Sequence, residues 1–157
     1  MRVLTLPLLI LLMACTGVDT EQLTTEFSVL KSIECDSLCS SLDVVSGDNI
    51  VFKYERTSED DLGFADDEFF EELLFEIAPI QSDSFRLQDS LFSKHRLVYR
   101  NICFGTCTGD YVTIEGGEIS GSRVDSFQWN ITIDVEFNLG RRVIPIRIEE
   151  PFTKAEF

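Results

Sequence analysis

The sequence predicts an all-β fold, either an antiparallel β-sandwich or a small β-barrel of about eight strands, with one short helix. Two observations support this fold class. From Phe127 to Phe137, apolar and polar residues alternate strictly, which is the period of a strand with one buried face. Other apolar segments of strand length are separated by short runs rich in Gly, Asp, Asn and Ser, which favour turns.

The individual elements follow from the same patterns. Strands are expected at 27–33, 50–56, 85–88, 97–103, within 111–124, at 127–137 and at 144–148, and a short helical turn at 89–93. A turn is predicted at 46–49, where the sequence reads Ser-Gly-Asp-Asn. Gly116, Gly117 and Gly121 indicate a bulge or sharp curvature. Pro145 has no N–H to donate, so the last strand is expected at a sheet edge or with Pro145 facing outward.

The segment 68–77 fits two structures. Its apolar residues match helical spacing, but Phe69, Leu73, Phe75 and Ile77 also share one face of a strand. Because the flanking sequence is strand-like, we predict a strand here.

The chain of 157 residues is long enough to bury a core, and one domain is expected. Thirteen phenylalanines supply much of the apolar area. Trp129 is in register with the apolar residues of its strand and is therefore predicted to be a core residue.

The first fifteen residues contain a distinctive signal. Arg2 supplies a positive charge, an apolar run follows from Val3 to Met13, and the run ends in Leu-Met-Ala followed by Cys15. This resembles the lipobox of bacterial lipoproteins, in which an aliphatic residue and a small residue precede a lipidated cysteine. The resemblance implies cleavage before Cys15 and attachment of diacylglycerol to its sulfur. The alternative is an ordinary secretory signal cleaved nearby, for example after Gly17.

The lipobox also implies a domain organisation and a location. Residues 1–14 would be the signal peptide, 15–24 a lipidated tether and 25–157 a single β-rich domain. The mature protein would be held on the extracytoplasmic side of the bacterial envelope, most often at the outer membrane, with the lipid bilayer as its partner. The body resembles small β-rich lipoproteins of Gram-negative bacteria in its G-x-I-x-G segment, Gly117–Gly121, followed by a tryptophan strand.

The charge of the chain argues against polyanionic partners. Residues 15–157 carry 28 acidic and 12 basic residues, a formal net charge of −16. Because each phosphate contact requires a cation, neither nucleic acid nor anionic lipid headgroups are expected as partners. Cationic partners or divalent metal ions are favoured instead.

Four cysteines remain besides Cys15. They form two C-x-x-x-C pairs, Cys35 with Cys39 and Cys103 with Cys107. An even number of cysteines in an exported chain predicts disulfides, although the connectivity stays open. A local bridge needs a turn or helix, because residues four apart in a strand are separated by about 13 Å. The alternative is a thiol site or a copper or zinc site on the same four residues.

An acidic run between 59 and 76 contains no Lys or Arg. Its loop could supply carboxylate oxygens to a calcium ion, and the candidate ligands are Asp60, Asp61, Asp66, Asp67 and Glu68. The spacing does not match an EF-hand, so a solvated acidic loop without a cofactor is the alternative.

No catalytic residue is predicted. His95, the single histidine, sits in a basic segment and is expected to be exposed. Phosphate loops, dinucleotide fingerprints and nucleophile elbows are absent from the sequence. The expectation is therefore a membrane-anchored, non-enzymatic binding or structural module. A hydrolase of envelope carbohydrate or peptide and a thiol or copper protein are the alternatives.

Overall fold

The computed structural model describes residues 21–35, 42–58, 69–79, 83–103, 112–114, 116–139 and 142–155. Their strands are β1 (Glu21–Cys35), β2 (Leu42–Ser58), β3 (Phe69–Ile77), β4 (Ser84–Gln88), β5 (Val98–Cys103), β6 (Val112–Thr113), β7 (Gly116–Arg123), β8 (Gln128–Leu139) and β9 (Arg142–Lys154). The one helical element among these residues is a 3-10 turn, Asp89–Leu91. The predicted all-β class is confirmed, and residues 69–77 of the ambiguous segment form a strand.

All nine described strands belong to one sheet, in the order β4-β7-β8-β9-β1-β2-β3-β5-β6. Neighbouring strands are antiparallel except β9 and β1, which run parallel over two residue pairs. The described residues form nine strands rather than about eight, because two strands, β6 and β7, lie within the glycine-rich segment 111–124. The sheet is not closed, so of the two predicted architectures the sandwich-like one is found.

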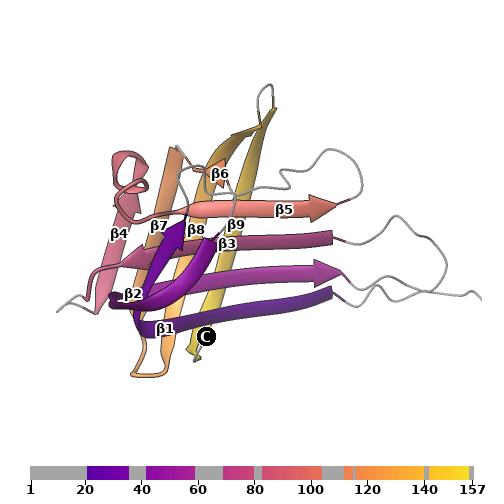
Figure 1. The fold of residues 1–157 in the computed structure, drawn as a ribbon. Helices are drawn as coiled ribbons and strands as arrows, with labels where there is room; N and C mark the ends of the chain where they lie inside the picture. The colour runs from indigo at the N-terminus through magenta and orange to yellow at the C-terminus, as the bar shows by residue number, and fades with distance from the viewer. Residues whose placement is uncertain are drawn as a thin grey trace, which may run out of the picture.

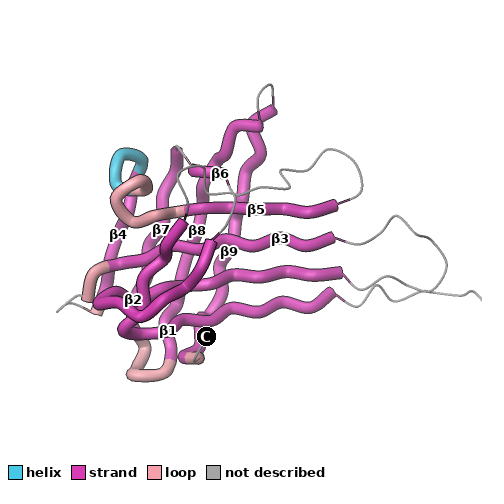
Figure 2. Tube along the Cα trace, in the orientation of Figure 1, coloured by secondary structure: helices cyan, strands magenta, loops and turns pink. Residues whose placement is uncertain are grey.

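The open sheet makes two layers. In Figure 1, β1, β2, β3 and β5 run side by side, and β7, β8 and β9 cross behind them. The short contact between β9 and β1 is the corner at which the sheet passes from one layer to the other. Layers that cross in this way bury the inner face of each. Figure 2 shows strands and loops through nearly all of the described chain, and no helix in it is long and apolar enough to cross a bilayer.

Aromatic side chains fill the space between the layers. Phe52 of β2 lies 4.8 Å from Phe75 and 5.8 Å from Trp129, measured between ring centroids. Phe85 of β4 reaches the same group, 5.7 Å from Phe52. The first pair is stacked, the second edge-on and the third tilted, and aromatic pairs of this kind each contribute about 0.5–1.5 kcal/mol beyond the burial of their area. The four strands that supply these rings therefore share one core.

The alternation of β8 is nearly as predicted. Its apolar residues from Trp129 to Phe137 are buried, and the polar residues between them are exposed. Trp129 is confirmed as a core residue. Phe127 is the exception: the strand begins at Gln128, and Phe127 is 67% exposed in the preceding turn.

The β1–β2 hairpin bends sharply halfway along. The register slips between Val29 and Ser32, where Lys31 faces both Ser46 and Asn49, and Leu30 adopts a φ of 59°. The turn predicted at 46–49 is therefore wrong, because these residues form a bulge inside β2. The bulge redirects both strands without ending either of them.

Beyond the bend, residues 31–35 and 42–46 form an arm that folds over the outer face of β3. Ile33 of the arm packs with Val51, Leu74 and Val98 in a second, smaller apolar cluster. This second cluster explains why both faces of β3 are buried, and why its sequence did not alternate clearly between polar and apolar residues.

One boundary prediction is corrected. Residues 21–24, which were assigned to the tether, already belong to β1. For Pro145 the second of the two predicted alternatives is found: β9 lies between β8 and β1 rather than at a sheet edge, and Pro145 is exposed. The contact with β1 covers only Thr153 and Lys154, so Pro145 interrupts no ladder on that side.

The predicted glycine distortions are found in β7. Gly117 has a φ of +115°, and a side chain there would collide with the backbone of Asp134. Gly121 lies opposite Phe85, and a Cβ on Gly121 would come within 2.3 Å of that ring. The missing side chain at 121 therefore makes room for an aromatic residue of the neighbouring strand.

Candidate binding surface

Most of the site residues predicted from the sequence lie outside the described residues. These are Cys15, Cys39, Cys107 and the candidate calcium ligands Asp60, Asp61, Asp66, Asp67 and Glu68. Cys35 and Cys103 are the last residues of β1 and β5. Strand pairing does not bring their backbones together, because β2 and β3 lie between these strands in the sheet. Within the described ranges, no three His, Cys, Asp or Glu side chains gather as a metal site.

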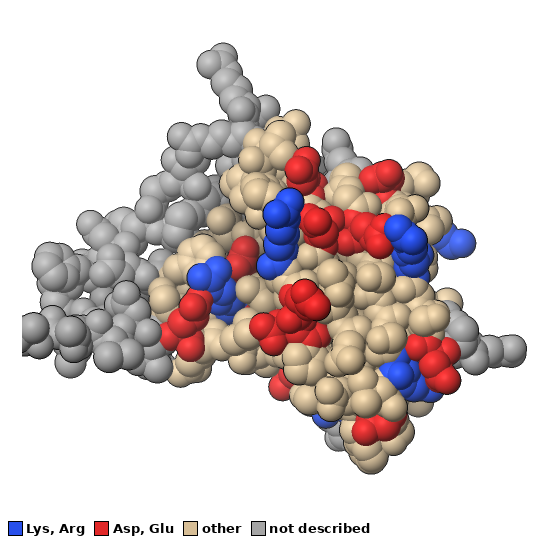
Figure 3. Space-filling model, turned by 180° about the vertical axis from the view of Figure 1, so that it is seen from behind, with Lys and Arg blue, Asp and Glu red and all other residues tan. Residues whose placement is uncertain are grey.

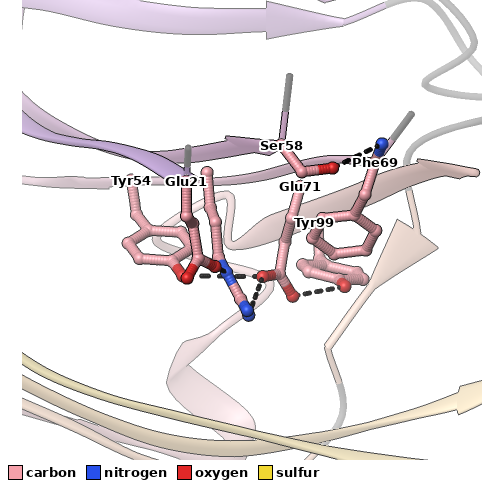
Figure 4. Close-up of polar contacts among 7 residues, drawn as sticks. Glu21, Tyr54, Ser58, Phe69, Glu71 and Tyr99 are labelled. Carbon is pink, nitrogen blue, oxygen red and sulfur yellow. Dashed lines mark hydrogen bonds and ion pairs between the residues drawn. The ribbon is translucent and has the colours of Figure 1, made fainter. Parts of the chain in front are cut away.

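A buried carboxylate continues the inner face of β3 beyond its apolar residues. Glu71 accepts a hydrogen bond from the Tyr99 hydroxyl at 2.6 Å and a longer one from Tyr54 at 3.5 Å. The Arg56 guanidinium lies 3.7 Å from the same carboxylate and also pairs with Glu21. Figure 4 shows Glu71 between the two tyrosines. The cluster combines an acid, its donors and a cation, so the buried charge is compensated.

The tyrosines of this cluster are donors rather than nucleophiles. Burial raises the pKa of both Tyr54 and Tyr99, and the neighbouring Glu71 carboxylate raises both further. Both hydroxyls therefore keep their protons at neutral pH and hold Glu71 in place. The arrangement supports the fold and offers no activated group for chemistry.

The opposite face of β3 carries two more buried glutamates. Glu72 pairs with Arg100 at 3.0 Å. Glu76 accepts the backbone N–H of Ile33 at 2.8 Å and lies 3.5 Å from the Arg96 guanidinium. Both carboxylates are thus satisfied by cations or backbone donors, which is the usual condition for burying a charge.

His95 is half-buried rather than exposed as predicted. Its Nδ1 lies 2.9 Å from the backbone oxygen of Glu76, and its own carbonyl accepts the Glu76 N–H. The residue therefore fastens the turn before β5 to the end of β3. Among the described residues, the hydrogen bonds of His95 are with backbone atoms. His95 therefore forms no catalytic pair with a described carboxylate.

A hollow of about 680 Å³ lies on the outer face of β7, β8 and β9. Its walls are Gln88, Asp89, Gly116, Gly117, Glu118, Ser120, Thr132, Asp134, Glu136 and Arg147. The outward residues of β8 form its floor, and the 3-10 turn contributes one rim. Asp89 accepts the Gly117 N–H at 3.0 Å, which ties that rim to β7.

The charges in this hollow are predominantly negative. It holds four carboxylates and one guanidinium, Arg147, which lies 3.3 Å from Asp134. Glu118 receives hydrogen bonds from Arg86 at 2.5 Å and from Gln88 at 2.8 Å. These two bonds lower the pKa of Glu118 and keep it ionised. The hollow therefore suits a ligand with positive charge and hydrogen-bond donors.

The polar surface extends further across β4, β7 and β8. A smaller hollow of about 350 Å³ shares Glu118, Ser120 and Thr132 with the first and adds hydroxyl and amide side chains together with Arg86 and Phe85. Figure 3 shows the molecule from behind, with acidic side chains in several groups and fewer basic ones between them. The polar face thus offers carboxylates at one end, and hydroxyl and amide groups beside a guanidinium at the other.

Sequence reasoning missed this hollow. The alternation of β8 did identify its floor, Thr132, Asp134 and Glu136, as a polar face. Asp89 and the glycine pair are distant in sequence and reach the hollow only through the pairing of β4, β7 and β8. Comparisons of the chain with protein-family models, curated proteins and solved structures found no match.

Proposed function

We propose that this protein is a lipid-anchored binding module of the bacterial envelope, tethered through Cys15, and that it is not an enzyme. The hollow on the outer face of β7, β8 and β9 is its binding surface. The ligand class is a cationic molecule with several hydrogen-bond donors, such as a lysine-rich peptide segment. The observation that carries this proposal is the hollow itself, with four carboxylates against one guanidinium.

The packing of the core supports a surface site over an interior one. Phe52, Phe75 and Trp129 are almost fully buried and contact one another between the layers. A ligand that entered between the described layers would have to displace these rings, at a cost comparable to the large core substitutions of about 3–5 kcal/mol. The outer hollow needs no such rearrangement.

The chemistry of the described carboxylates favours binding over hydrolysis. A hydrolytic pair needs one carboxyl group that keeps its proton near neutral pH. Glu118 has the opposite character, because Arg86 and Gln88 lower its pKa. Glu71 is buried and occupied by tyrosine hydroxyls. Both acids therefore act as hydrogen-bond acceptors.

A trilysine peptide is a suitable probe for the hollow. We expect its titration to shift the backbone amide signals of Gly116, Gly117 and Thr132 in two-dimensional NMR spectra. A double variant, Asp134→Asn with Glu136→Gln, should lose most of the effect. Salt should weaken the binding, because the attraction is largely between exposed charges.

The matched control removes the same charge elsewhere. Glu34 and Asp43 face each other across the arm and are both exposed. The variant Glu34→Gln with Asp43→Asn should bind trilysine with nearly unchanged affinity. Equal losses in the two double variants, or shifts spread over the whole surface, would show that the peptide responds only to net charge and would refute the site.

A further inference from the structure

Three exposed apolar residues belong to segments that meet at one end of the molecule. Leu30 is 67% exposed, Val124 54% and Phe127 67%. Val124 and Val29, the neighbour of Leu30, line a common hollow of about 450 Å³, and Phe127 belongs to the turn that forms its wall. We call these three residues the apolar tip. They are among the few large apolar residues that the described structure exposes.

Hydrogen bonds hold the tip in a fixed shape. The Val124 N–H donates to the Gln128 carbonyl at 2.9 Å, and the Phe127 N–H donates to Asp125 at 2.7 Å. The Phe127 carbonyl accepts the Lys154 N–H at 2.8 Å, which joins the turn to the end of β9. The exposure of Phe127 is therefore built into the turn. This residue is also the one apolar member of the alternating segment 127–137 that the core excludes.

Basic side chains border the tip. Arg123 stacks over Trp129 at 5.3 Å and lies 3.9 Å from Asp83. Lys154 lines the same hollow and forms no ion pair with any residue that the structure describes. An exposed aromatic ring and aliphatic side chains next to Lys and Arg are typical of protein segments that lie in the membrane–water interface. Two acidic residues, Asp83 and Asp125, line the same hollow, so its formal charge is neutral, whereas the chain as a whole is acidic.

The third observation is the position of the tip relative to the start of β1 at Glu21. Five residues lie between Cys15 and Glu21, and the chain from one to the other spans at most about 20 Å. From Glu21 the strand β1 leads to Leu30, about 30 Å further along. Figure 1 shows β1 and the turn between β7 and β8 on the same side of the molecule. A bilayer could thus contact the protein at both ends of the first half of β1.

We propose that the apolar tip is a second membrane contact, which inserts Phe127, Val124 and Leu30 into the interface of the bilayer that holds the Cys15 anchor. This inference rests on the lipid anchor of the proposed function. Two contacts would fix the orientation of the domain, with β1 lying along the membrane surface. A protein that binds the tip is the competing occupant, and the experiment below separates the two.

Tryptophan fluorescence can test the contact directly. Phe127→Trp places a reporter at the tip, and Val143→Trp places a matched reporter at the other end of the β8–β9 hairpin, where Val143 is 60% exposed. The native Trp129 is buried and gives a constant background. The full lipidated chain is reconstituted into phosphatidylethanolamine–phosphatidylglycerol vesicles that contain lipids brominated in the acyl chain.

We expect a blue shift and strong bromine quenching for Phe127→Trp but not for Val143→Trp. If the tip reporter remains as accessible to aqueous iodide as the control, the tip faces water or a protein partner and the proposal is overturned.

A second experiment tests the tip independently of the anchor. Cys15→Ser removes the lipidation site, and this chain is mixed with an excess of the same vesicles. Quenching of the Phe127→Trp reporter should persist at high lipid concentration, and Phe127→Ser should lower the partition coefficient about tenfold or more. Val143→Ser should leave it unchanged. If the lipidated chain does not float with vesicles, the proposed lipid anchor is contradicted. If the reporter is not quenched in either experiment, the proposed membrane contact of the tip is contradicted.

Discussion

The carboxylate of Glu76 accepts the backbone N–H of Ile33 at 2.8 Å, across 43 residues of sequence. Both residues are buried, Ile33 completely. The bond fastens the arm to the outer face of β3, where Ile33 also contacts Leu74 and Val98. A single acidic side chain thus adds a polar link to the apolar contacts between the arm and β3.

Replacing Glu76 should test this link. Glu76→Leu leaves the Ile33 N–H buried without its acceptor, so we expect the free energy of unfolding to fall by about 1–3 kcal/mol in urea denaturation. Glu76→Gln retains an oxygen acceptor and should cost clearly less. Amide hydrogen exchange at Ile33 should accelerate in the leucine variant and hardly change in the glutamine variant. Equal stability of the two variants would show that the bond contributes nothing.

The hydrogen bond from Tyr99 to Glu71 should contribute more to the free energy of unfolding than the bond from Tyr54 to Glu71. The first measures 2.6 Å and the second 3.5 Å. Because Glu71 is buried and charged, Tyr99→Phe should lower the free energy of unfolding by about 2 kcal/mol. Tyr54→Phe is the matched control and should cause a smaller loss. The reverse order in equilibrium denaturation would contradict the geometry.

The same tyrosines predict a loss of stability in alkaline solution. Burial, followed by Glu71, raises the pKa of Tyr99 and Tyr54 above the unfolded value of about 10. The folded state therefore binds their protons more tightly, and this stabilisation is complete below about pH 10 and lost as the pH rises further. The free energy of unfolding should fall more steeply above about pH 10 in the native protein than in the double Tyr→Phe variant. Parallel pH profiles for the two proteins would refute the prediction.

Gly121 and Gly116 offer a matched pair of substitutions in β7. A Cβ at Gly121 would meet the Phe85 ring at 2.3 Å, whereas at Gly116 the nearest atom is 4.0 Å away. Gly121→Ala should therefore destabilise the protein by about 1–3 kcal/mol, and Gly116→Ala should be neutral or slightly stabilising. Combining Gly121→Ala with Phe85→Leu should recover part of the loss. A thermal melt of Gly121→Ala that equals that of Gly116→Ala would contradict the packing described here.

The sequence predicts the fold class well where one face of a strand is buried. The alternation of β8 gave its buried and exposed sides residue by residue, apart from Phe127. The sequence was a poorer guide to strands and turns where tertiary contacts override the local pattern. β3 is buried on both sides because the arm covers its outer face, and the bulge at 46–49 resembles a turn in local composition.

The candidate site was less predictable than the fold. The hollow joins the 3-10 turn to β7 and β8, and no local pattern relates Asp89 to Gly117. The apolar tip is invisible in the sequence for a similar reason, because Phe127 matches the buried residues of its strand in both type and spacing. Only the start of β8 at Gln128 places it outside the core.

Mass spectrometry of the intact protein, extracted with detergent from the membranes of a Gram-negative host, tests the lipid anchor most directly. The account predicts a mature chain that begins at Cys15 and carries the added mass of diacylglycerol, and it predicts that Cys15→Ser abolishes both features. A mature chain that starts at another residue, or one that starts at Cys15 without lipid, would contradict the anchor on which the proposed function depends.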